Sequence, residues 1–170
     1  ETPYIGIAFA LLCANPPDKD ATKLLEPQCM GQIDISEVNI VNIKQRALEL
    51  SPAILRTPTV RTKSFMMESL LEGGALYLKL ECLQHAGSFK SRGALSVIHS
   101  IPSDEKPAGI TAASAGNHAI AAAWAARKSG LSAKVVMQST ANPFRIALAQ
   151  SERAEIIIKE PGKATFAEAE

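Results

Sequence analysis

The chain has 170 residues, of which 46% are hydrophobic and 21% are charged, and its formal net charge is +1. These values are ordinary for a globular protein, and they give no electrostatic reason to expect a nucleic-acid partner or a membrane partner. Only 5% of the residues are aromatic, which also disfavours a stacking surface for single-stranded nucleic acid.

The cysteines and histidines form no recognisable framework. Cys13, Cys29 and Cys82 are odd in number and contain no C-x-x-C motif, and the three histidines are scattered. The sequence therefore predicts neither a disulfide framework nor a metal site, and it fits a reducing, cytoplasmic setting. Cys82 follows an expected strand, where we expect it to be a small buried apolar side chain.

Residues 1–35 are expected to form an N-terminal extension. The uncharged run at 4–14 is too short to cross a bilayer and lacks the basic region that precedes a signal-peptide core. It predicts a buried strand or an N-terminal remnant. The following residues, 15–20, read NPPDKD and predict a turn or loop.

From residue 36 onward, helical and strand-like patterns alternate. The expected helices are 36–50 with Ser36 as its cap, 64–74, 89–99, 117–129, and 142–152 with Asn142 as its cap. The expected strands are 75–81, 109–113, 133–138 and 155–160, and residues 57–59 are expected to be extended. This alternation predicts an α/β fold with a parallel sheet covered by helices.

The chain ends on ATFAEAE, residues 164–170, which is a helix-forming composition without a C-cap. A helix that stops in the middle of its pattern suggests the N-terminal part of a longer protein.

The placement of Lys90 raises a chemical question. Ser88 is expected to cap the helix that follows, which puts Lys90 and Arg92 in a first turn where the helix dipole disfavours cations by about 0.3–1 kcal/mol. A lysine that acts as a nucleophile must be neutral part of the time, and positive potential and an apolar setting favour the neutral form. The alternative is a solvated surface lysine, which charge placement alone favours.

The motifs around Lys90 resemble those of a known family. LKLECLQHAGSFKSRGA at 78–94 is similar to the active-lysine motif of the threonine dehydratase and serine racemase group of pyridoxal-phosphate enzymes. SAGNHA at 114–119 resembles the asparagine loop of that group, and RTPT at 56–59 resembles its substrate-side segment. The resemblance runs from about residue 36 to the end of the chain.

This resemblance implies an α/β fold of the tryptophan synthase β-like type. Residues 36–100 would form the first part of the large cofactor-binding domain, and residues 101–170 would form an incomplete small domain. Relatives often dimerise, so a homo-oligomer is expected for the full-length protein.

The resemblance also implies the roles of individual residues. Lys90 would bond to the aldehyde of pyridoxal 5'-phosphate and act as the catalytic base, while Phe89 would pack near the ring and Asn117 would bond its phenolic oxygen. The residues expected at the substrate carboxylate are Ser88, Ser114, Ala115, Gly116 and His118. Backbone N–H groups at a helix start suit an anion, although a tight turn that needs Gly116 would give the same local sequence.

The implied activity is conversion of L-threonine or L-serine to a 2-oxo acid and ammonia. Ala115 stands where racemases of the group carry an acidic serine, and a methyl group cannot transfer a proton. Phe89, Ser91 and His118 fit the dehydratase pattern better than the β-replacement pattern. A nucleotide site at 109–118 is disfavoured because G-x-G-x-x-G is absent.

Two alternatives stay open: a non-catalytic, truncated or degenerate remnant of the family, and a racemase-like or β-replacement enzyme of the same fold. The glycine-rich phosphate loop and the residue facing the pyridine nitrogen, both typical of the family, are absent from these 170 residues. Arg153 stands where a glycine is typical. If that position has a left-handed backbone, the arginine costs about 1–2 kcal/mol.

Overall fold

Two separate sheets organise the computed structural model, which describes residues 5–6, 38–70, 74–104 and 109–162. The larger sheet is parallel, with the strand order β1-β4-β5-β6. Its strands are β1 (Ile5–Gly6), β4 (Ile110–Ala113), β5 (Ala133–Gln138) and β6 (Glu155–Lys159). The α/β class and the parallel sheet expected from the sequence are therefore confirmed.

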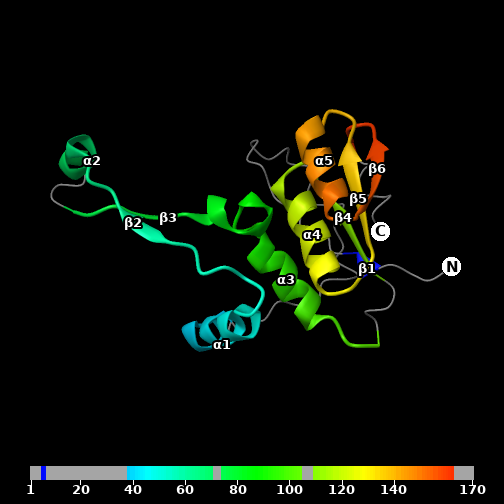
Figure 1. Ribbon diagram of the computed structural model, residues 1–170, viewed down its shortest axis with the longest axis horizontal. Coiled ribbons are helices and arrows are strands. Elements are labelled where there is room, and N and C mark those ends of the chain that lie inside the picture. The colour runs from blue at the N-terminus through cyan, green and yellow to red at the C-terminus, as the bar shows by residue number, and fades with distance from the viewer. Residues whose placement is uncertain (1–4, 7–37, 71–73, 105–108, 163–170) are drawn as a thin grey trace, which may run out of the picture.

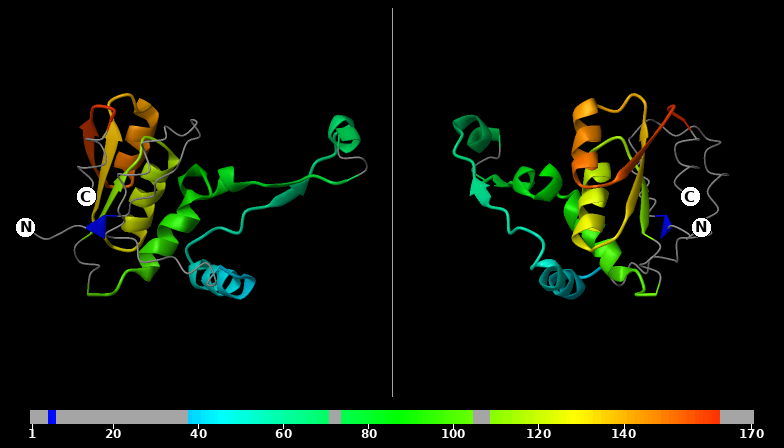
Figure 2. Two further views of the ribbon diagram at one scale, coloured as in Figure 1. Left: turned by 180° about the vertical axis from the view of Figure 1, so that it is seen from behind. Right: turned by 45° about the vertical axis from the view of Figure 1, so that its right-hand side comes forward.

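Two helices connect these strands and cover one face of the sheet, as Figures 1 and 2 show. They are α4 (Asn117–Lys128) and α5 (Pro143–Ser151). Residues 118–126 of α4 are all buried, and six of these nine positions are alanine. The small alanine side chains let the helix axis approach the sheet closely, while Val135 and Met137 fill the core from β5.

Local capping explains where several helices begin. The Asn142 side chain accepts a hydrogen bond of 2.9 Å from the Phe144 N–H, and Pro143 occupies the first turn, as expected. In α1 (Ile40–Leu50), Asn39 accepts a bond of 2.9 Å from the Asn42 N–H. The expectation that Ser36 caps this helix is therefore wrong, because an asparagine three residues later performs that role.

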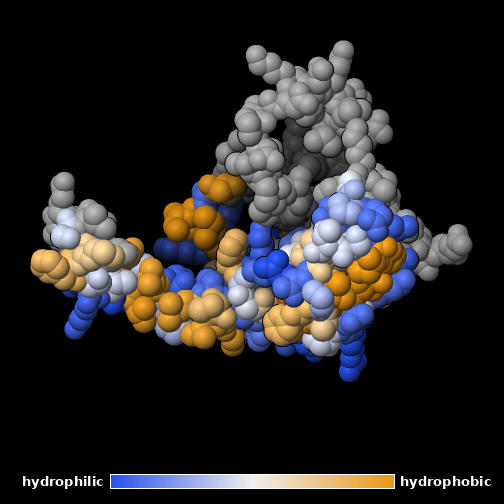
Figure 3. Space-filling view, turned by 90° about the horizontal axis from the view of Figure 1, so that it is seen from above, coloured by the Kyte–Doolittle hydropathy of each residue, from blue (hydrophilic) through white to orange (hydrophobic). Residues whose placement is uncertain are grey.

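The segment between α1 and the active-lysine motif forms an arm that projects from the body (Figures 1 and 2). It contains β2 (Thr59–Arg61), α2 (Phe65–Leu70) and β3 (Tyr77–Lys79). The two strands are antiparallel, because the chain returns directly through α2 instead of crossing over the sheet. Apolar side chains gather along this arm in Figure 3, and Phe65 at its tip is 88% exposed.

The sequence-based elements agree with the structure, usually within a few residues. The helix expected at 89–99 is α3 (Lys90–Ser100), which packs between α1 and α4. The uncharged run at 4–14 is described only at 5–6, where β1 pairs with β4. Predictions for 15–20 and for 164–170 lie outside the described residues, and the division into 36–100 and 101–170 stays a prediction.

The turn between α5 and β6 contains a strained residue. Arg153 has a φ of 67°, so the backbone at this position is left-handed and the condition for a strained arginine is met. An Arg153→Gly substitution is expected to stabilise the protein by about 1 kcal/mol, because the strain removed exceeds the added flexibility of the unfolded chain. Chemical denaturation monitored by circular dichroism measures this change, and an unchanged or lower midpoint would contradict it.

Candidate active site

Two short 3-10 turns shape the chain before Lys90. They span Glu81–Leu83 and His85–Gly87, and they follow directly on β3. Ala86 and Gly87 both have positive φ values, 56° and 65°. An alanine in this conformation is strained, and such strain concentrates where a structure must aim a functional side chain.

Ser88 does not cap α3, which corrects the expectation from the sequence. After the two left-handed residues, Ser88 is extended, and Phe89 occupies the cap position without a side-chain hydrogen bond. Ser88 is only 8% exposed, and its Oγ has no hydrogen-bond partner among the residues that the structure describes. A buried hydroxyl without a partner is costly, so it is a group suited to a bound ligand.

Lys90 is the first residue of α3 and is partly buried. Its Nζ lies 5.1 Å from the centroid of the Phe89 ring, and within the described ranges it makes no ion pair or hydrogen bond. Arg92 was expected to add positive potential beside Lys90. That expectation is wrong, because the Arg92 side chain is engaged by an acid from the preceding turn.

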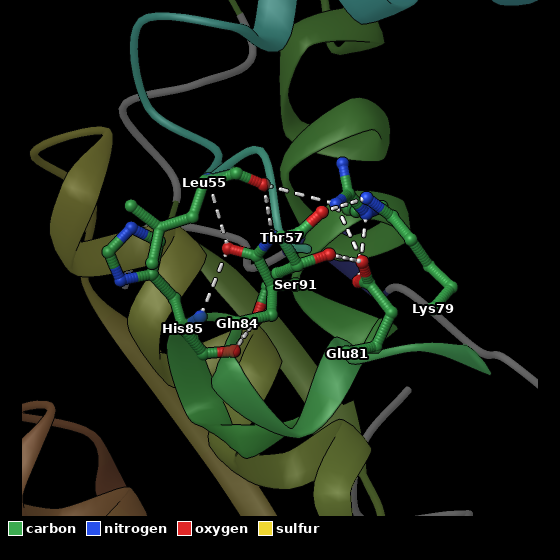
Figure 4. A network of polar contacts seen from close by, with 8 residues as sticks. Leu55, Thr57, Lys79, Glu81, Gln84, His85 and Ser91 are labelled. Carbon is green, nitrogen blue, oxygen red and sulfur yellow. Dashed lines mark hydrogen bonds and ion pairs between the residues drawn. The ribbon is translucent and has the colours of Figure 1, made fainter. Parts of the chain in front are cut away.

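Glu81 is the acid that binds Arg92, and Figure 4 shows Glu81 beside Thr57 and Lys79. Its two carboxylate oxygens accept from Arg92 Nε at 2.9 Å and from Nη2 at 2.7 Å, and the Thr57 hydroxyl donates to it at 2.5 Å. Lys79 Nζ donates to the backbone carbonyl of Thr57. The hydrogen bonds from Arg92 are the main reason that the pKa of Glu81 falls from 4.5 to about 2.

Gln84 ties the same turn to the chain before the arm. Its side-chain amide accepts a hydrogen bond from the Leu55 N–H at 3.1 Å and donates one to the Leu55 carbonyl at 2.8 Å (Figure 4). The amide thus satisfies both backbone groups of Leu55, as a neighbouring strand would. The Ser91 hydroxyl donates to the carbonyl of His85, whose ring stacks on Trp124 with centroids 4.7 Å apart. The turn that precedes Lys90 is thus fixed to three different parts of the fold.

The network formed by Glu81, Gln84 and Arg92 was not predicted from the sequence. Glu81 precedes Lys90 in the sequence and Arg92 follows it, so their opposite charges indicated that an ion pair could form. Their geometry was not predictable, because Glu81 and Arg92 meet only after the intervening left-handed turn reverses the chain.

The second motif forms the loop that opens α4. The Ser114 N–H donates to the Val136 carbonyl at 3.0 Å, so the loop starts at the carboxyl ends of β4 and β5. Ser114 Oγ accepts from the Gly116 N–H at 3.2 Å, and Gly116 is the cap residue of α4. The cap has no side-chain hydrogen bond and the first turn of α4 has no acid, so its N–H groups retain their partial positive charge.

His118 connects this loop with Lys90. The imidazole is buried, and burial is the main cause of its lowered pKa, with the charge of Lys90 as the second cause. Because the shift is downward from 6.5, His118 is neutral at pH 7. The electrostatic contact places the two motifs, 28 positions apart in the chain, around one site at the start of α3 and α4.

The remaining candidates lie at the edge of this site. Phe89 is 59% exposed, Asn117 is exposed, and Ala115 is partly buried in the α4 loop. Their roles toward the cofactor and the substrate carboxylate stay predictions. Cys82 is exposed and not buried, because it lies in a 3-10 turn on the outside of the fold.

The described part of the chain has neither a metal-binding cluster nor a membrane-spanning helix. No three His, Cys, Asp or Glu side chains there come together in a way that would hold a metal ion. None of the described helices has the length and apolar character needed to span a membrane.

Comparison with known families gives the chemical context of this site. The family described as "Pyridoxal-phosphate dependent enzyme" matches residues 50–170, which is more than half of the chain and includes both motifs. The chain belongs to the pyridoxal-phosphate dependent enzyme family. The family and the cofactor expected from the lysine and asparagine motifs are therefore confirmed.

Curated members of this family with similar sequences are dehydratases. The chain is 47% identical to phenylserine dehydratase of Ralstonia pickettii over 94 residues, covering 55% of this chain and 29% of that protein. It is 37% identical over 122 residues to catabolic L-threonine dehydratase of Staphylococcus aureus, covering 72% and 35%. The chain thus spans about a third of the length of these relatives.

A solved member of the family has the same fold. Maize serine racemase superposes with a TM-score of 0.70 at 28% identity, over 77% of this chain and 39% of that one. This likeness supports the tryptophan synthase β-like fold expected for the chain.

The residues at the site fit the cofactor of the family. Pyridoxal phosphate carries an aldehyde, which needs an amine that is not held in an ion pair, and Lys90 offers such an amine among the described residues. The buried Ser88 hydroxyl and the uncapped N-terminus of α4 supply polar groups for bound anions. A partly buried amine beside these groups is the arrangement that a covalently held, anionic cofactor requires.

Proposed function

We propose that the protein carrying this chain is a pyridoxal-phosphate dependent lyase that converts a β-hydroxy amino acid, L-threonine or L-serine, to a 2-oxo acid and ammonia. The observation that carries the proposal is the amine of Lys90. It is partly buried, it makes no ion pair with a described residue, and its charge is near enough to the buried His118 to help lower the pKa of that imidazole.

The chain's own residues have separate tasks in this reaction. Bound pyridoxal phosphate supplies the electron sink for the bond broken at Cα. The Lys90 amine removes the Cα proton, and loss of the hydroxyl from Cβ with a proton releases water. Water then hydrolyses the released unsaturated amine, which breaks its C–N bond and gives the 2-oxo acid and ammonia. The backbone N–H groups of 115–118 and the Ser88 and Ser114 hydroxyls hold the carboxylate, so that the Cα–H bond stays aligned with Lys90.

His118 serves this arrangement by remaining neutral. A protonated imidazole at this position would repel the Lys90 ammonium and compete with the loop for the substrate carboxylate. Burial keeps the pKa of His118 low, so the loop and Lys90 are the main positive groups at the site near pH 7.

The choice of substrate class rests on a shared chemical feature. The names of the two curated relatives, phenylserine dehydratase and L-threonine dehydratase, both refer to amino acids with a hydroxyl on Cβ. Elimination requires that hydroxyl, whereas racemisation requires a second acid, and Ala115 offers only a methyl group in the α4 loop. Dehydration is therefore favoured over the racemase and β-replacement alternatives.

We further propose that the protein works in the cytoplasm as a homo-oligomer and that residues 36–100 and 101–170 belong to a large and a small domain. The extended arm with its exposed apolar side chains supports an additional covering surface in the assembled protein.

The decisive experiment uses the complete polypeptide that carries this sequence, loaded with pyridoxal phosphate. Borohydride reduction followed by peptide mass mapping should place the cofactor on Lys90. Incubation with L-threonine or L-serine should release ammonia and a 2-oxo acid in equal amounts. A label on another lysine, or no label, would overturn the proposal. D-amino acid formed without ammonia would identify a racemase, and a labelled protein without turnover would identify a non-catalytic remnant.

A further inference from the structure

One backbone carbonyl joins the two ends of the segment that carries Lys90. The Leu55 carbonyl accepts a hydrogen bond of 2.8 Å from Gln84 Nε2 and another of 3.1 Å from Arg92 Nη2. Gln84 precedes Lys90 in the chain and Arg92 follows it. Residues 84–92, here called the lysine segment, therefore form a loop whose two ends are bonded to the same point of the chain before the arm.

Gln84 is the buried member of this closure. The residue is only 4% exposed, whereas the Arg92 side chain is 38% exposed. Gln84 Oε1 accepts from the N–H groups of Leu55 at 3.1 Å and of His85 at 3.0 Å, so both ends of the amide are bonded (Figure 4). The reversed amide would direct its NH2 group at two other donors. These three hydrogen bonds therefore fix a single orientation of the side chain.

The turn inside the lysine segment contains a strained residue. The Gln84 carbonyl accepts from the Gly87 N–H at 2.9 Å, which closes the turn around Ala86. Ala86 has a φ of 56° and a ψ of 18°, a left-handed conformation that is unfavourable for alanine and easy for glycine. A methyl group makes no hydrogen bond, so the neighbours of Ala86 must maintain this conformation. The Gln84 amide holds the turn at its start, and the Ser91 hydroxyl holds it through the His85 carbonyl.

We propose that Gln84 is a positioning residue for the Lys90 amine, and that it acts by holding the strained turn at Ala86 against the Leu55 backbone. The inference rests on the lyase function proposed above, in which Lys90 removes the Cα proton. Only residues 87–89 separate Ala86 from Lys90, so a change in the turn moves the start of α3 with it. A base displaced by about 1 Å slows its reaction about 100-fold.

Kinetics of a Gln84→Met variant test this role in the complete, cofactor-loaded polypeptide. Methionine keeps the length of the side chain and suits a buried position, but it cannot replace the three hydrogen bonds. The kcat for 2-oxo acid formation should fall about 10- to 100-fold while KM stays within about threefold, because the proposed substrate contacts of the α4 loop remain. An increase in KM at constant kcat would contradict a positioning role. The matched control is Gln45→Met, which removes an exposed amide bonded to Glu49 and should leave both constants unchanged.

Two glycine substitutions separate positioning of Lys90 from general stability. Ala86→Gly removes the strain within the turn, so adding it to Gln84→Met should raise kcat at least about threefold. Arg153→Gly removes the same kind of strain from the turn between α5 and β6, where φ is 67°. Adding it to Gln84→Met should stabilise the fold without raising kcat. Equal recovery with the two substitutions would show that Gln84 supports only the overall fold, and the proposal would be wrong.

Hydrogen–deuterium exchange gives a readout that needs neither cofactor nor turnover. In the complete polypeptide without pyridoxal phosphate, peptides from the lysine segment should exchange at least about tenfold faster in Gln84→Met than in the wild type. Peptides from β4 and β5 should exchange at the wild-type rate. Unchanged exchange in the lysine segment, or equally faster exchange throughout the chain, would exclude a local positioning role.

A milder variant tests the same closure from its other end if Gln84→Met does not fold. Arg92→Lys keeps a positive charge beside Glu81, but a single ammonium group lacks the guanidinium fork that reaches both Glu81 and the Leu55 carbonyl. Exchange in the lysine segment should become faster, and kcat should fall about three- to tenfold at nearly constant KM. Wild-type exchange and kcat in this variant would overturn the closure.

The outcomes distinguish this inference from the proposed function. If the wild-type protein carries no cofactor on Lys90, the proposed function fails, and the positioning role fails with it. If the wild-type protein is an active lyase and Gln84→Met keeps the wild-type kcat, only the role of Gln84 fails. Loss of kcat at constant KM, with recovery by Ala86→Gly alone, supports both.

Discussion

Replacing Lys90 with alanine is expected to lower the rate of 2-oxo acid formation by about a thousandfold or more, because the variant loses both the covalent attachment and the positioned base. Coupled detection of the 2-oxo acid under saturating pyridoxal phosphate measures the loss. Folding should be nearly unaffected, since Lys90 makes no ion pair or hydrogen bond with another described side chain.

Two comparisons make the Lys90 result specific. Lys128→Ala removes an exposed lysine from the last turn of α4 and should retain full activity. A small primary amine added to Lys90→Ala should restore part of the rate, because it supplies the missing base. A Lys90→Ala variant that retains more than about a tenth of the wild-type rate would rule out Lys90 as the base.

The second large effect is expected at Glu81, which holds the turn before Lys90. A Glu81→Gln substitution should destabilise the protein by about 1–2 kcal/mol at pH 7, which allows for the partial exposure of Arg92. The variant replaces a two-pronged, charge-assisted contact with Arg92 by a neutral one. Chemical denaturation across a pH series measures the difference.

The lowered pKa of Glu81 determines how its contribution to stability changes with pH. The pKa of Glu81 is lowered from 4.5 to about 2 in the folded state. The stabilisation is therefore fully present above pH 4.5 and is lost as the pH falls from 4.5 toward 2. Wild type and Glu81→Gln should converge in stability at the acidic end of that range. A constant difference between them would show that the carboxylate charge is not responsible.

A surface ion pair provides the matched control for Glu81. Arg46 Nη1 lies 3.0 Å from Glu49 Oε2 on α1, and both side chains are substantially exposed. Glu49→Gln should change stability by less than about 0.5 kcal/mol at any pH, because water screens an exposed pair. A larger effect at Glu49 than at Glu81 would contradict the importance assigned to the turn before Lys90.

Features determined by neighbouring residues were predictable from the sequence. Asn142 and Pro143 mark the start of α5 through their own side chains, and Ser51 follows the end of α1. A left-handed backbone at Arg153 was considered as a condition because a glycine is typical there, and its φ of 67° meets that condition. Each of these depends on the conformation of a few adjacent residues.

Features that depend on distant contacts were not predictable. Ser88 looked like a cap because the sequence does not show that Ala86 and Gly87 both become left-handed. That turn is held by Gln84, whose partner Leu55 is 29 residues away. Arg92 looked like a cation beside Lys90 because its pairing with Glu81 exists only after the turn has formed. The motif identified the chemistry, whereas long-range contacts determine how its side chains are aimed.

The stack of His85 on Trp124 has a practical consequence. Trp124 is the only tryptophan of the chain, and it is buried against the turn that leads to Lys90. Within these 170 residues, the indole fluorescence therefore comes from a single location. A ligand that shifts the turn would alter the ring contact and the polarity around the indole. These residues thus contain a native optical reporter in the helix that packs against the turn before Lys90.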